Sequence, residues 1–559
     1  MRFACKMSAC TSSNLVVQHC KAREELARTH RQPKKIAQAS TRASTFRGVT
    51  SWFQPESALR RTSLRLRLSP KRAMAPVAGE VSQVPDDVRK KFTRLQNGSD
   101  VRGVALDGVE GEPVTLSCQE AYFIAAGFAE WLKGAVSHSD RLTVSVGQDS
   151  RLSGDALVEA ILSGLASQGV AADGIGLATT PACFMSTIAP DHEYDGSIMV
   201  TASHLPWNRN GMKFFSAKGG LKKADIAVLL SNAMNNAASV GTPPSPDAAA
   251  AELIGSVDFM PCYCAHLIDL IRKGVNHPET YDKPLTGLKV IVDAGNGSGG
   301  FMASQVLAPL GADTTGSQFL DPDGNFPNHV PNPEDKQAME MTTAAVLENK
   351  ADLGIVFDTD VDRSGVVDSS GLEINKNRLI ALLSAIVLKE YPGSTIVTDS
   401  VTNDGVSEFI TAKGGEHYRY RRGYANVISK GKELNTQGTV SPLMIETSGH
   451  GAMKDNYFLD DGAYLAVQIL IELVRQRLAG SGSLSDLLDG YKEAKEAREF
   501  RLKVTVEDFK PAGELVVEGF RELAVSGRHP WEMAAVNHEG YRVSIDEGEG
   551  RRGWILFRQ

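Results

Sequence analysis

Three carboxylates occupy alternate positions directly after an apolar run of the chain. The run covers residues 353–357, and Asp358, Asp360 and Asp362 follow it. Three negative charges this close together repel one another unless a cation lies among them. Carboxylate oxygens with room for water or phosphate are ligands that Mg²⁺ prefers. The spacing therefore predicts a magnesium site at the end of a buried strand.

Two other kinds of acidic loop fit the same stretch less well. An EF-hand loop has glycine at its sixth position and glutamate at its twelfth, where this chain has Arg363 and Ser369. A phosphatase that uses a D-x-D aspartate has threonine or valine at the fifth position, where this chain has Asp362. A solvated surface loop is also disfavoured, because such a charge run rarely follows so apolar a strand.

A serine and a histidine stand together at a predicted turn. Residues 197–200 form a predicted strand, Ser203 and His204 follow it, and Lys213 begins another apolar stretch. A serine beside a histidine and a cation has the groups needed to carry a phosphoryl group. The stretch lacks the G-x-S-x-G pattern of acyl-transfer hydrolases. An ordinary serine-containing turn is the alternative interpretation.

A third polar stretch carries Glu446, Ser448 and His450 on alternate residues, with Lys454 shortly after them. Carboxylate, hydroxyl and imidazole groups in one loop can all hydrogen-bond the hydroxyl groups of a polyol. The stretch is therefore a candidate sugar-binding loop, and an ordinary surface loop is the alternative.

A glycine-rich turn follows the predicted strand at 289–293. Its residues 295–300 match G-x-G-x-x-G, the phosphate-binding pattern of dinucleotide-binding folds. A tight turn between a strand and a helix also needs glycines, and no predicted strand ends cleanly at the downstream Asp313 or Asp321. A nucleotide-dependent oxidoreductase is therefore a minor alternative.

The stretches that carry these residues belong to an alternation of strands and helices. Apolar strand patterns occur at 142–146, 289–293, 353–357 and 394–398, with helical patterns at 154–168 and 301–310. Such alternation predicts βαβ units with mostly parallel sheets, whose ligands collect at the carboxyl ends of the strands. The last segment instead has three strand-like patterns, at 501–506, 541–545 and 553–557.

Shifts in composition divide the 559 residues into five predicted segments. They are a leader, three segments in which strands and helices alternate, and a shorter last segment with strand-like patterns. Their ranges are 1–75, 90–275, 276–392, 393–498 and 499–559. Within the first of the three alternating segments, residues 237–251 are rich in Ala, Pro, Gly and Ser and predict a surface loop.

The net charge of −7 conceals a basic N-terminal segment. Residues 1–74 carry 16 Lys and Arg against three acidic residues, with many Ser and Thr, so the rest of the chain is acidic. This composition is typical of an organellar transit peptide and predicts a chloroplast protein, with mitochondrion and cytoplasm as alternatives. A nucleic-acid-binding tail is disfavoured, because the acidic remainder offers no continuation of a basic surface.

Hydropathy and the number and spacing of cysteines bear on whether the protein spans a membrane or forms disulfides. No apolar run reaches the ~20 residues needed to span a bilayer, so no membrane partner is expected. The cysteines outside the leader contain no CxxC pair and are expected to be free thiols in a reducing compartment. They are Cys118, Cys183, Cys262 and Cys264.

Taken in order, these stretches resemble the α-D-phosphohexomutase superfamily, in particular its phosphoglucomutase/phosphomannomutase branch. The family's T-A-S-H-N-P, D-G-D-x-D-R and G-E-x-S-G-H sequences appear as Thr201-Ala-Ser-His-Leu-Pro206, Asp358-Thr-Asp-Val-Asp-Arg363 and Ile445-Glu-Thr-Ser-Gly-His450. Shorter matches are Asp100-Val-Arg-Gly103, Gly147-Gln-Asp-Ser-Arg151, Thr179-Thr-Pro181 and Asp293-Ala-Gly-Asn-Gly297. The resemblance covers about residues 90–559. Leu205 and Thr359 depart from the family's Asn and Gly, at positions that supply no metal ligand.

The resemblance implies four domains around a central cleft: three α/β domains with mixed, mostly parallel sheets and a smaller α+β domain, here incomplete. It also implies transfer of a phosphoryl group between C1 and C6 of a hexose. It makes Ser203 the phosphorylated residue and, with Asp358, Asp360 and Asp362, a ligand of Mg²⁺. Hexose 1,6-bisphosphate is the implied intermediate and activator. Three cations would neutralise the transferring group: Arg102, Lys213 and Arg363. His204 and His450 would transfer protons or position hydroxyls. The implied sugar-phosphate ligands are Glu446, Ser448, His450, Lys454 and Arg558.

The end of the sequence departs from the family. Its last domain carries a phosphate-binding R-x-S-G-T-E-P loop, whereas here the leading strand, residues 553–557, is followed only by Arg558 and Gln559. We therefore expect an incomplete chain. A non-catalytic homologue that binds sugar phosphate is the alternative function. Glucose, mannose and glucosamine remain open as the sugar, and a monomer or weak homodimer is expected, with hexose phosphate as the partner and no nucleic acid.

Overall fold

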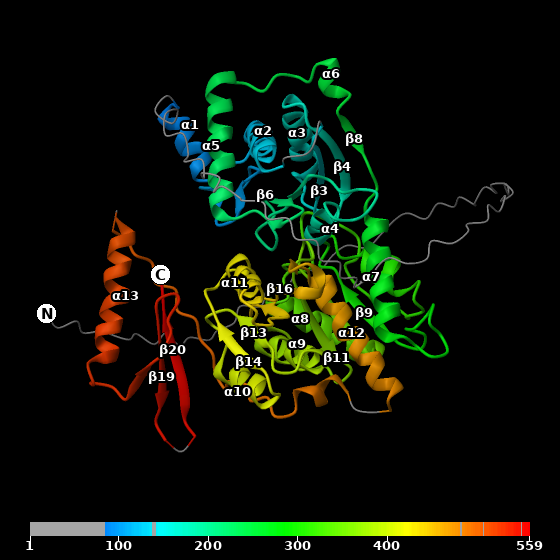
Figure 1. Cartoon of the computed structure of the whole chain (residues 1–559), viewed down its shortest axis with the longest axis vertical. Coiled ribbons are helices and arrows are strands. Elements are labelled where there is room, and N and C mark those ends of the chain that lie inside the picture. Colours follow the sequence, from blue (N-terminus) through cyan, green and yellow to red (C-terminus); the bar gives the residue numbers. More distant parts are fainter. Residues whose placement is uncertain (1–83, 137–140, 481–482, 507, 549) are drawn as a thin grey trace, which may run out of the picture. The chain divides into compact units, whose positions relative to one another are not determined.

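The computed structural model describes residues 84–136, 141–480, 483–506, 508–548 and 550–559. The predicted leader, residues 1–75, lies outside the described residues. Strands and helices alternate through most of the described chain, as predicted, and the strands form four sheets (Figure 1). Within the described ranges, no helix is both long and apolar enough to cross a membrane.

The first sheet carries Ser203 and Lys213 on or beside its strands. Its strands lie in the order β1-β2-β6-β5-β3-β4-β8, with β7 paired to β6. β3 pairs in parallel with β4 and β5, whereas β6 runs antiparallel to β5 and β2. The strands are β1 (Gln96–Asn97), β2 (Asp100–Val104), β3 (Thr143–Gln148), β4 (Ala171–Leu177), β5 (Gly196–Val200), β6 (Arg209–Ser216), β7 (Gly219–Gly220) and β8 (Ile254–Ser256).

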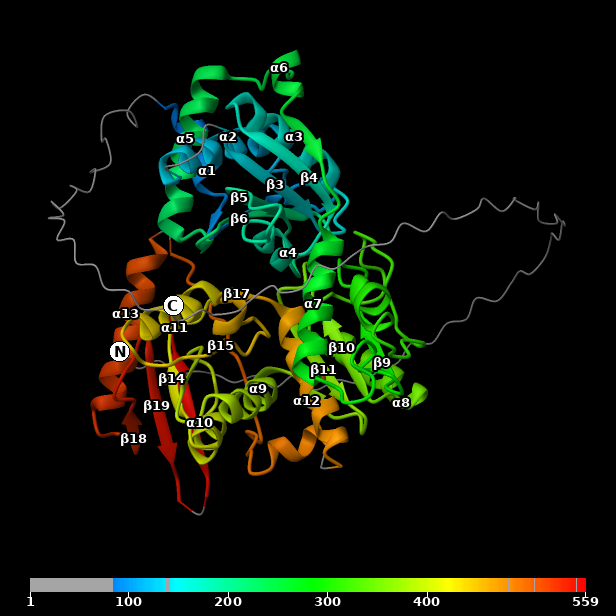
Figure 2. The same ribbon diagram turned by 45° about the vertical axis from the view of Figure 1, so that its right-hand side comes forward.

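Helices cover both faces of the first sheet. The helices are α1 (Asp86–Thr93), α2 (Cys118–Ala135), α3 (Gly154–Ser167), α4 (Thr180–Met185), α5 (Lys223–Val240) and α6 (Ala248–Ala251). Figure 2 shows α2, α3 and α5 above the strands and α4 below them. β5 is buried on both faces: Ile198 and Val200 join the cluster with α2, α3 and α5, and Met199 packs with α4. The apolar run at residues 198–200 follows from this double burial.

The predicted surface loop at 237–251 is shorter than expected. α5 continues to Val240, and Ala248–Ala251 form a helical turn whose preceding Asp247 accepts from the N–H of Ala250 at 2.8 Å. Only residues 241–247 connect the two helices. Alanine's high helix propensity outweighed the Pro and Gly nearby.

The second sheet carries the acidic loop. Its order is β12-β11-β10-β9, with β9 and β10 parallel and β11 antiparallel to β10. Its elements are α7 (Met260–Val275), β9 (Val290–Asp293), η2 (Met302–Leu307), α8 (Lys336–Asn349), β10 (Leu353–Phe357), β11 (Ser364–Asp368) and β12 (Glu373–Ile374). The helix predicted at 301–310 is the six-residue π-helix η2. β10 and β11 enclose residues 358–363 as a tight hairpin connection.

The third sheet has the order β14-β13-β15-β16-β17, and β13 pairs in parallel with both β14 and β15. β15 and β16 enclose the predicted sugar loop. The elements are α9 (Lys376–Glu390), β13 (Thr395–Thr398), α10 (Asp404–Ala412), β14 (Glu416–Arg419), α11 (Tyr424–Thr436), β15 (Leu443–Ile445), β16 (Gly451–Met453), η3 (Lys454–Asn456), β17 (Leu459–Asp460), α12 (Gly462–Leu478) and η4 (Leu484–Leu488).

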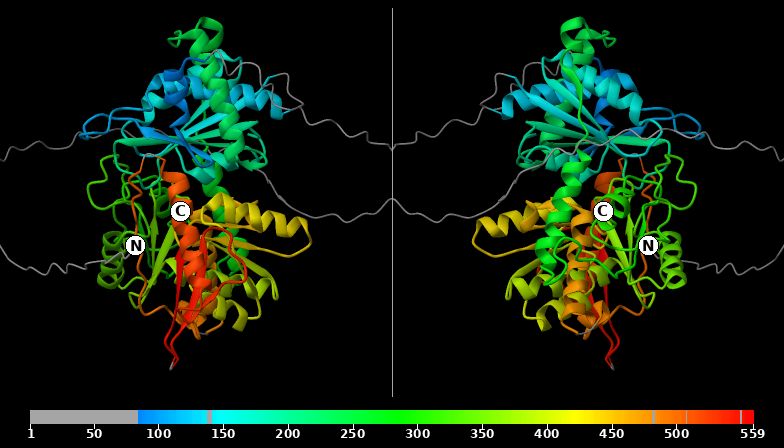
Figure 3. Two further views of the ribbon diagram at one scale, coloured as in Figure 1. Left: turned by 90° about the vertical axis from the view of Figure 1, so that its left-hand side faces the viewer. Right: turned by 90° about the vertical axis from the view of Figure 1, so that its right-hand side faces the viewer.

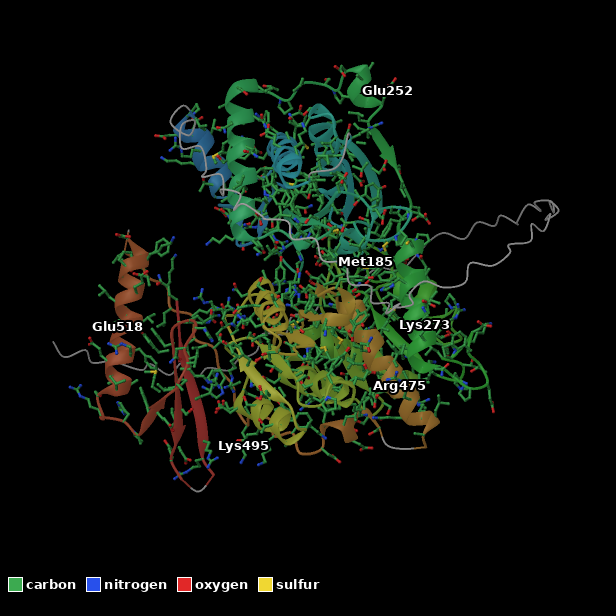
Figure 4. The ribbon with its side chains drawn as sticks, viewed as in Figure 1. Met185, Glu252, Lys273, Arg475, Lys495 and Glu518 are labelled. Carbon is green, nitrogen blue, oxygen red and sulfur yellow. The ribbon has the colours of Figure 1, made fainter. Side chains whose placement is uncertain are left out.

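The largest buried cluster joins α4, α7, α9, α12 and the strands of the second and third sheets. α7 packs on α12 and η2, and Arg475 of α12 donates to the carbonyl of Gly274 at 2.7 Å. Figure 4 labels Arg475 and Lys273 on these two neighbouring helices, and Met185 at the end of α4. This shared core holds the strand ends that carry the polar loops.

A smaller β-rich unit ends the described chain. β18 (Trp531–Met533), β19 (Tyr541–Asp546) and β20 (Arg552–Phe557) form an antiparallel sheet, and α13 (Phe509–Val525) packs against it (Figure 3). The strands predicted at 541–545 and 553–557 are present. The strand predicted at 501–506 is wrong: these residues have no regular structure, and the apolar side chains of Leu502 and Val506 are exposed. In the part of the chain that the structure describes, no strand is paired with this alternating pattern.

Candidate active site

Ser203 lies in a turn that is fixed by a buried arginine. Its backbone φ is 52°, in the left-handed region, and its N–H donates to the hydroxyl of Thr201 at 2.8 Å. Arg151 donates to the carbonyls of Pro206 and Arg209 at 2.7 and 2.9 Å, and also to that of Ser203. Arg151, at the end of the 147–151 turn, therefore fixes the backbone of the turn that carries Ser203. Sequence patterns did not predict this role.

Asp149 completes this support. Its carboxylate lies 3.3 Å from the Nε of Arg151 and accepts from the hydroxyl of Thr201 at 2.7 Å, and both charged side chains are fully buried. Because the charges are paired and hydrogen-bonded, their burial is tolerated. The geometry fixes a strained backbone at Ser203, which is a conformation that costs free energy unless its surroundings impose it.

The acidic loop brings its three carboxylates together. One oxygen from each of Asp358, Asp360 and Asp362 lies within 4.8 Å of the others, and all three residues are fully buried. Oδ1 of Asp360 and Oδ1 of Asp362 are buried without a hydrogen-bond partner. Buried carboxylate oxygens are costly to leave unpaired, and hard oxygen donors in this arrangement suit a divalent cation such as Mg²⁺.

Two buried cations neutralise part of this charge. Nζ of Lys213 lies 3.1 Å from Oδ2 of Asp360 and also contacts Asp362. Nε of Arg363 donates to Oδ2 of Asp358 at 3.0 Å. Burial opposes ionisation of Asp362, but the Lys213 ammonium outweighs it, and the pKa of Asp362 lies below its ordinary value. At Asp358 burial dominates and raises the pKa well above its ordinary value.

The serine and the acidic loop meet directly. The Ser203 hydroxyl donates to Oδ2 of Asp358 at 2.8 Å and accepts from Nη2 of Arg363. These residues are 155 or more positions apart in the sequence. The hydroxyl therefore lies at the edge of the carboxylate cluster with a guanidinium against it, where a phosphoryl group on Oγ would meet both cation and metal ligands.

The two histidines have different charges. His204 accepts at Nδ1 from Arg363, and although part of its surface is accessible, desolvation and the Arg363 charge lower its pKa to about 3. His450 is largely enclosed, which lowers its pKa, but Asp460 at 2.6 Å and Asp362 outweigh this and raise the pKa to about 9. Near neutral pH, His204 is neutral and His450 is a cation.

Arg102 is held beside the serine turn. Its guanidinium donates to the carbonyl of Thr201 and to Oδ2 of Asp100, each at 2.8 Å. Burial opposes the charge, but Asp100 and Asp360 raise the pKa of Arg102 above its ordinary value. A third cation therefore lies in the cluster, as the resemblance implied.

The predicted sugar loop reaches the acidic loop through the backbone. Arg363 and His450 form an isolated antiparallel β-bridge, and the carbonyl of His450 accepts from the N–H of Glu446 at 2.8 Å. Glu446 is buried, accepts from the N–H of Gly423 at 2.5 Å and lies 3.4 Å from the Ser448 hydroxyl. Burial and the nearby Asp399 raise the pKa of Glu446 to about 7.

Two predicted ligands lie apart from this cluster. Lys454 begins η3 and is exposed, and its N–H donates to the carbonyl of Pro442 at 2.9 Å, at the end of the β15–β16 pair opposite the sugar loop. Nη1 of Arg558 lies 3.7 Å from Oε1 of Glu539, a carboxylate that accepts from the N–H of Arg422 at 3.2 Å. Among the described residues, the contacts of Arg558 lead to the sugar loop through Glu539 and Arg422, which precedes Gly423.

Sequence patterns assigned no role to three residues of the cluster, Thr180, Tyr424 and Asp460. Thr180 donates to Oδ2 of Asp360 at 2.6 Å, and its N–H donates to the carbonyl of Asp360 at 2.9 Å. Tyr424 stacks on the His450 ring at 5.1 Å between centroids, and Asp460 pairs with the same histidine. The Thr179-Thr-Pro181 match and the acidic turn at 460–462 were the available signals for Thr180 and Asp460, since polar turns after strands mark this edge of a sheet.

Family models match most of the described chain. They are the phosphoglucomutase/phosphomannomutase α/β/α domains I, II and III, over residues 93–240, 265–371 and 375–494. Among curated proteins, the phosphomannomutase/phosphoglucomutase of Pseudomonas syringae pv. tomato is 31% identical over 459 residues, covering 81% of this chain and 86% of the relative. A phosphoglucomutase of Neisseria gonorrhoeae is 29% identical over 448 residues, covering 79% and 87%.

Solved structures agree with these matches. A phosphoglucomutase/phosphomannomutase family protein from Burkholderia thailandensis superposes with a TM-score of 0.64 and 26% identity, covering 84% of this chain and 93% of that one. A phosphomannomutase-like protein from Thermus thermophilus, at 18% identity and a TM-score of 0.58, covers 83% of this chain and 93% of that one and shares the fold.

Proposed function

The chain belongs to the phosphoglucomutase/phosphomannomutase family and is a hexose phosphate mutase, and on that premise we propose that it works through a phosphoserine at Ser203. The observation that carries the proposal is the position of the Ser203 hydroxyl, 2.8 Å from Oδ2 of Asp358 and in contact with Arg363. We further propose that glucose and mannose phosphates are both substrates, because the relatives above carry both activities in their names.

Magnesium fits the acidic loop. Oδ1 of Asp360 and Oδ1 of Asp362 have no hydrogen-bond partner among the described residues, and they lie with Asp358 in a set of hard oxygen donors. In our proposal Asp358, Asp360, Asp362 and an oxygen on Ser203 hold Mg²⁺. When bound, the ion supplies positive charge to the oxygens of the transferring phosphoryl group.

The rest of the cluster supplies alignment and charge. Phosphoryl transfer passes through a loose transition state, so fixed cations around the group contribute most of the catalysis. Arg363, Lys213 and Arg102 are positioned for this by buried carboxylates. These side chains need to move little during the reaction, because each cation is already held by a carboxylate before substrate arrives.

The proposed reaction has two balanced half-steps. In the first, the bond from phosphorus to Oγ of Ser203 breaks, a bond to the free hydroxyl of a hexose monophosphate forms, and the hydroxyl proton passes by way of a base to Oγ. The product is hexose 1,6-bisphosphate. In the second, the bond between the other phosphoryl group and its sugar oxygen breaks, a bond from that phosphorus to Oγ of Ser203 forms, and the Oγ proton passes to the sugar oxygen. His204, neutral near neutral pH, is the candidate base in the first half-step, and His450, a cation at the same pH, is the candidate proton donor to the sugar oxygen in the second.

Sugar recognition is assigned to the loop between β15 and β16. Glu446 and Ser448 are buried polar groups, and a hexose hydroxyl can donate to the carboxylate. His450, a cation at neutral pH, can donate to a sugar or phosphate oxygen. Glucose and mannose differ only at C2, so a loop that does not contact that hydroxyl would accept both.

The proposal is tested by assaying Ser203→Ala against wild type. The substrates are glucose 1-phosphate and mannose 1-phosphate, with Mg²⁺ and trace glucose 1,6-bisphosphate, and Ser239→Ala at the end of α5 is the control. We expect Ser203→Ala to lose turnover and keep hexose phosphate binding. Unchanged turnover in Ser203→Ala would contradict the phosphoserine. A wild-type chain that binds hexose phosphate without turnover would favour the non-catalytic alternative.

We also propose import into plastids, on the basic, Ser- and Thr-rich composition of residues 1–74. Fusion of residues 1–75 to a fluorescent protein should direct the reporter to chloroplasts. A reporter confined to mitochondria or cytoplasm would refute the proposal.

A further inference from the structure

A buried carboxylate beneath the acidic loop has no part in the chemistry described above. Asp293 ends β9 and is fully buried. It accepts from the N–H of Gly295 at 2.9 Å and from the amide of Gln318 at 2.8 Å, and the hydroxyl of Thr342 lies 3.1 Å away. Its remaining partner is Nε2 of His329, 3.0 and 3.2 Å from its two oxygens. The glycine turn that resembled a dinucleotide site is thus organised around this carboxylate.

His329 pairs with Asp293 as a buried cation. Its side chain is fully buried, and its second nitrogen, Nδ1, lies 2.9 Å from the carbonyl of Val330. A carboxylate and a carbonyl are both acceptors, so both ring nitrogens must carry protons. Burial favours the neutral ring, but Asp293 outweighs it and raises the pKa of His329 above its ordinary value.

The pair joins two segments, and each segment touches the reactive loop. After Asp293, the N–H of Ser298 donates to the carbonyl of Thr359 at 2.8 Å. A Cβ at Gly297 would lie only 2.7 Å from that carbonyl oxygen, so the backbone of this turn is in close contact with Thr359.

After His329, Asn332 accepts at Oδ1 from Nη1 of Arg363 at 3.3 Å. The two segments are also tied by Asn328, whose amide donates to Oδ1 of Asn296 at 2.8 Å. One segment therefore supports the carboxylates and the other supports the guanidinium that contacts Ser203.

We propose that the buried Asp293–His329 pair is the positioning element of the reactive loop, residues 358–363, and sets both its affinity for a divalent cation and the placement of Arg363. The expected effect on catalysis rests on the proposed function. The expected effect on cation affinity rests only on the geometry of the acidic loop. Outer partners of metal ligands typically change metal affinity about 10–100-fold when they are removed.

The test compares His329→Gln with Val346→Ala. Val346 is buried against the second sheet, in a cluster with Ile291 and Val356, so its truncation destabilises the same sheet without removing the pair. Mn²⁺ binding is measured by electron paramagnetic resonance, and kcat and KM for glucose 1-phosphate are measured with Mg²⁺. For His329→Gln we expect the Kd of Mn²⁺ to rise roughly tenfold and kcat to fall. We expect KM to be unchanged, because the partners of Asp293 and His329 in the described residues include none in the sugar loop.

Equal Mn²⁺ affinity in His329→Gln and Val346→Ala would overturn the proposal. Wild-type protein that binds Mn²⁺ but lacks mutase turnover would overturn the proposed function and leave the role of the Asp293–His329 pair open to test. The Kd values of the two variants for Mn²⁺ would still decide that role.

Asn332→Ala tests the second segment without disturbing the pair, since Asn332 lies three residues beyond His329 and bonds Arg363 through its own side chain. It should lower kcat roughly tenfold, the equivalent of about 1.4 kcal/mol, and leave the Kd of Mn²⁺ unchanged. An unaltered kcat would show that support of Arg363 through this segment is absent.

Discussion

The hydroxyl of Tyr424 donates to Oδ1 of Asp100 at 2.9 Å, joining residues 324 positions apart. The other oxygen of Asp100 accepts from Arg102, which in turn donates to the carbonyl of Thr201. Tyr424, at the start of α11, therefore supports a cation beside the serine turn of the first sheet.

Removing that hydroxyl tests the connection. Tyr424→Phe leaves Asp100 with one fewer donor and frees Arg102 to move, so we expect kcat/KM to fall roughly tenfold, the equivalent of about 1.4 kcal/mol. Steady-state kinetics with glucose 1-phosphate measure this. Tyr281→Phe, at an exposed tyrosine, should change nothing; an equal loss in both variants would rule out a specific role for Tyr424.

Loss of the Lys213 ammonium should destabilise the protein most when no metal is present. Lys213→Met leaves Asp360 and Asp362 buried beside each other without their cation, and removing one partner of a buried pair costs about 3–5 kcal/mol. Urea unfolding in EDTA should show this loss, and added Mg²⁺ should recover part of it. Lys273→Met breaks an exposed pair and should cost under about 1 kcal/mol. A Lys213→Met protein as stable as Lys273→Met in EDTA would refute the argument.

A methyl group at Gly297 should disturb the acidic loop. The added Cβ of Gly297→Ala would lie 2.7 Å from the carbonyl oxygen of Thr359 and 2.8 Å from its Cα, so the backbone must shift. We expect at least a roughly tenfold loss of kcat and weaker Mn²⁺ binding, measured by steady-state kinetics and titration. Gly134→Ala, in α2 with open space around it, is the matched control. Wild-type Mn²⁺ affinity in Gly297→Ala would count against close contact.

The KM for hexose phosphate should depend on pH through Glu446. Its pKa is raised to about 7, so the side chain is neutral below that pH and a carboxylate, the better acceptor for sugar hydroxyls, above it. KM should therefore fall as pH rises from about 6 to about 8. Glu446→Gln should have a higher KM that does not change over this range. A variant that keeps the wild-type pH profile would exclude Glu446 as the titrating group.

Sequence patterns predicted the local parts of the cluster well. Asp358, Asp360 and Asp362 follow one apolar strand, and their spacing alone brings their oxygens together. Local patterns assigned no role to Thr180 and Tyr424, because they reach the site from other elements, 180 and 324 residues from the groups they contact. The false strand at 501–506 had an alternating pattern, but such a pattern cannot specify a partner strand.

The left-handed backbone of Ser203 constrains how the protein can change over evolutionary time. At a φ of 52°, the branched side chain of threonine is strongly disfavoured, although threonine would keep a hydroxyl. Glycine and asparagine adopt this conformation readily. Substitution of Ser203 is therefore more apt to give a protein that folds normally but has no nucleophile than one with a different nucleophile. A duplicated gene can in this way yield a well-folded relative without turnover.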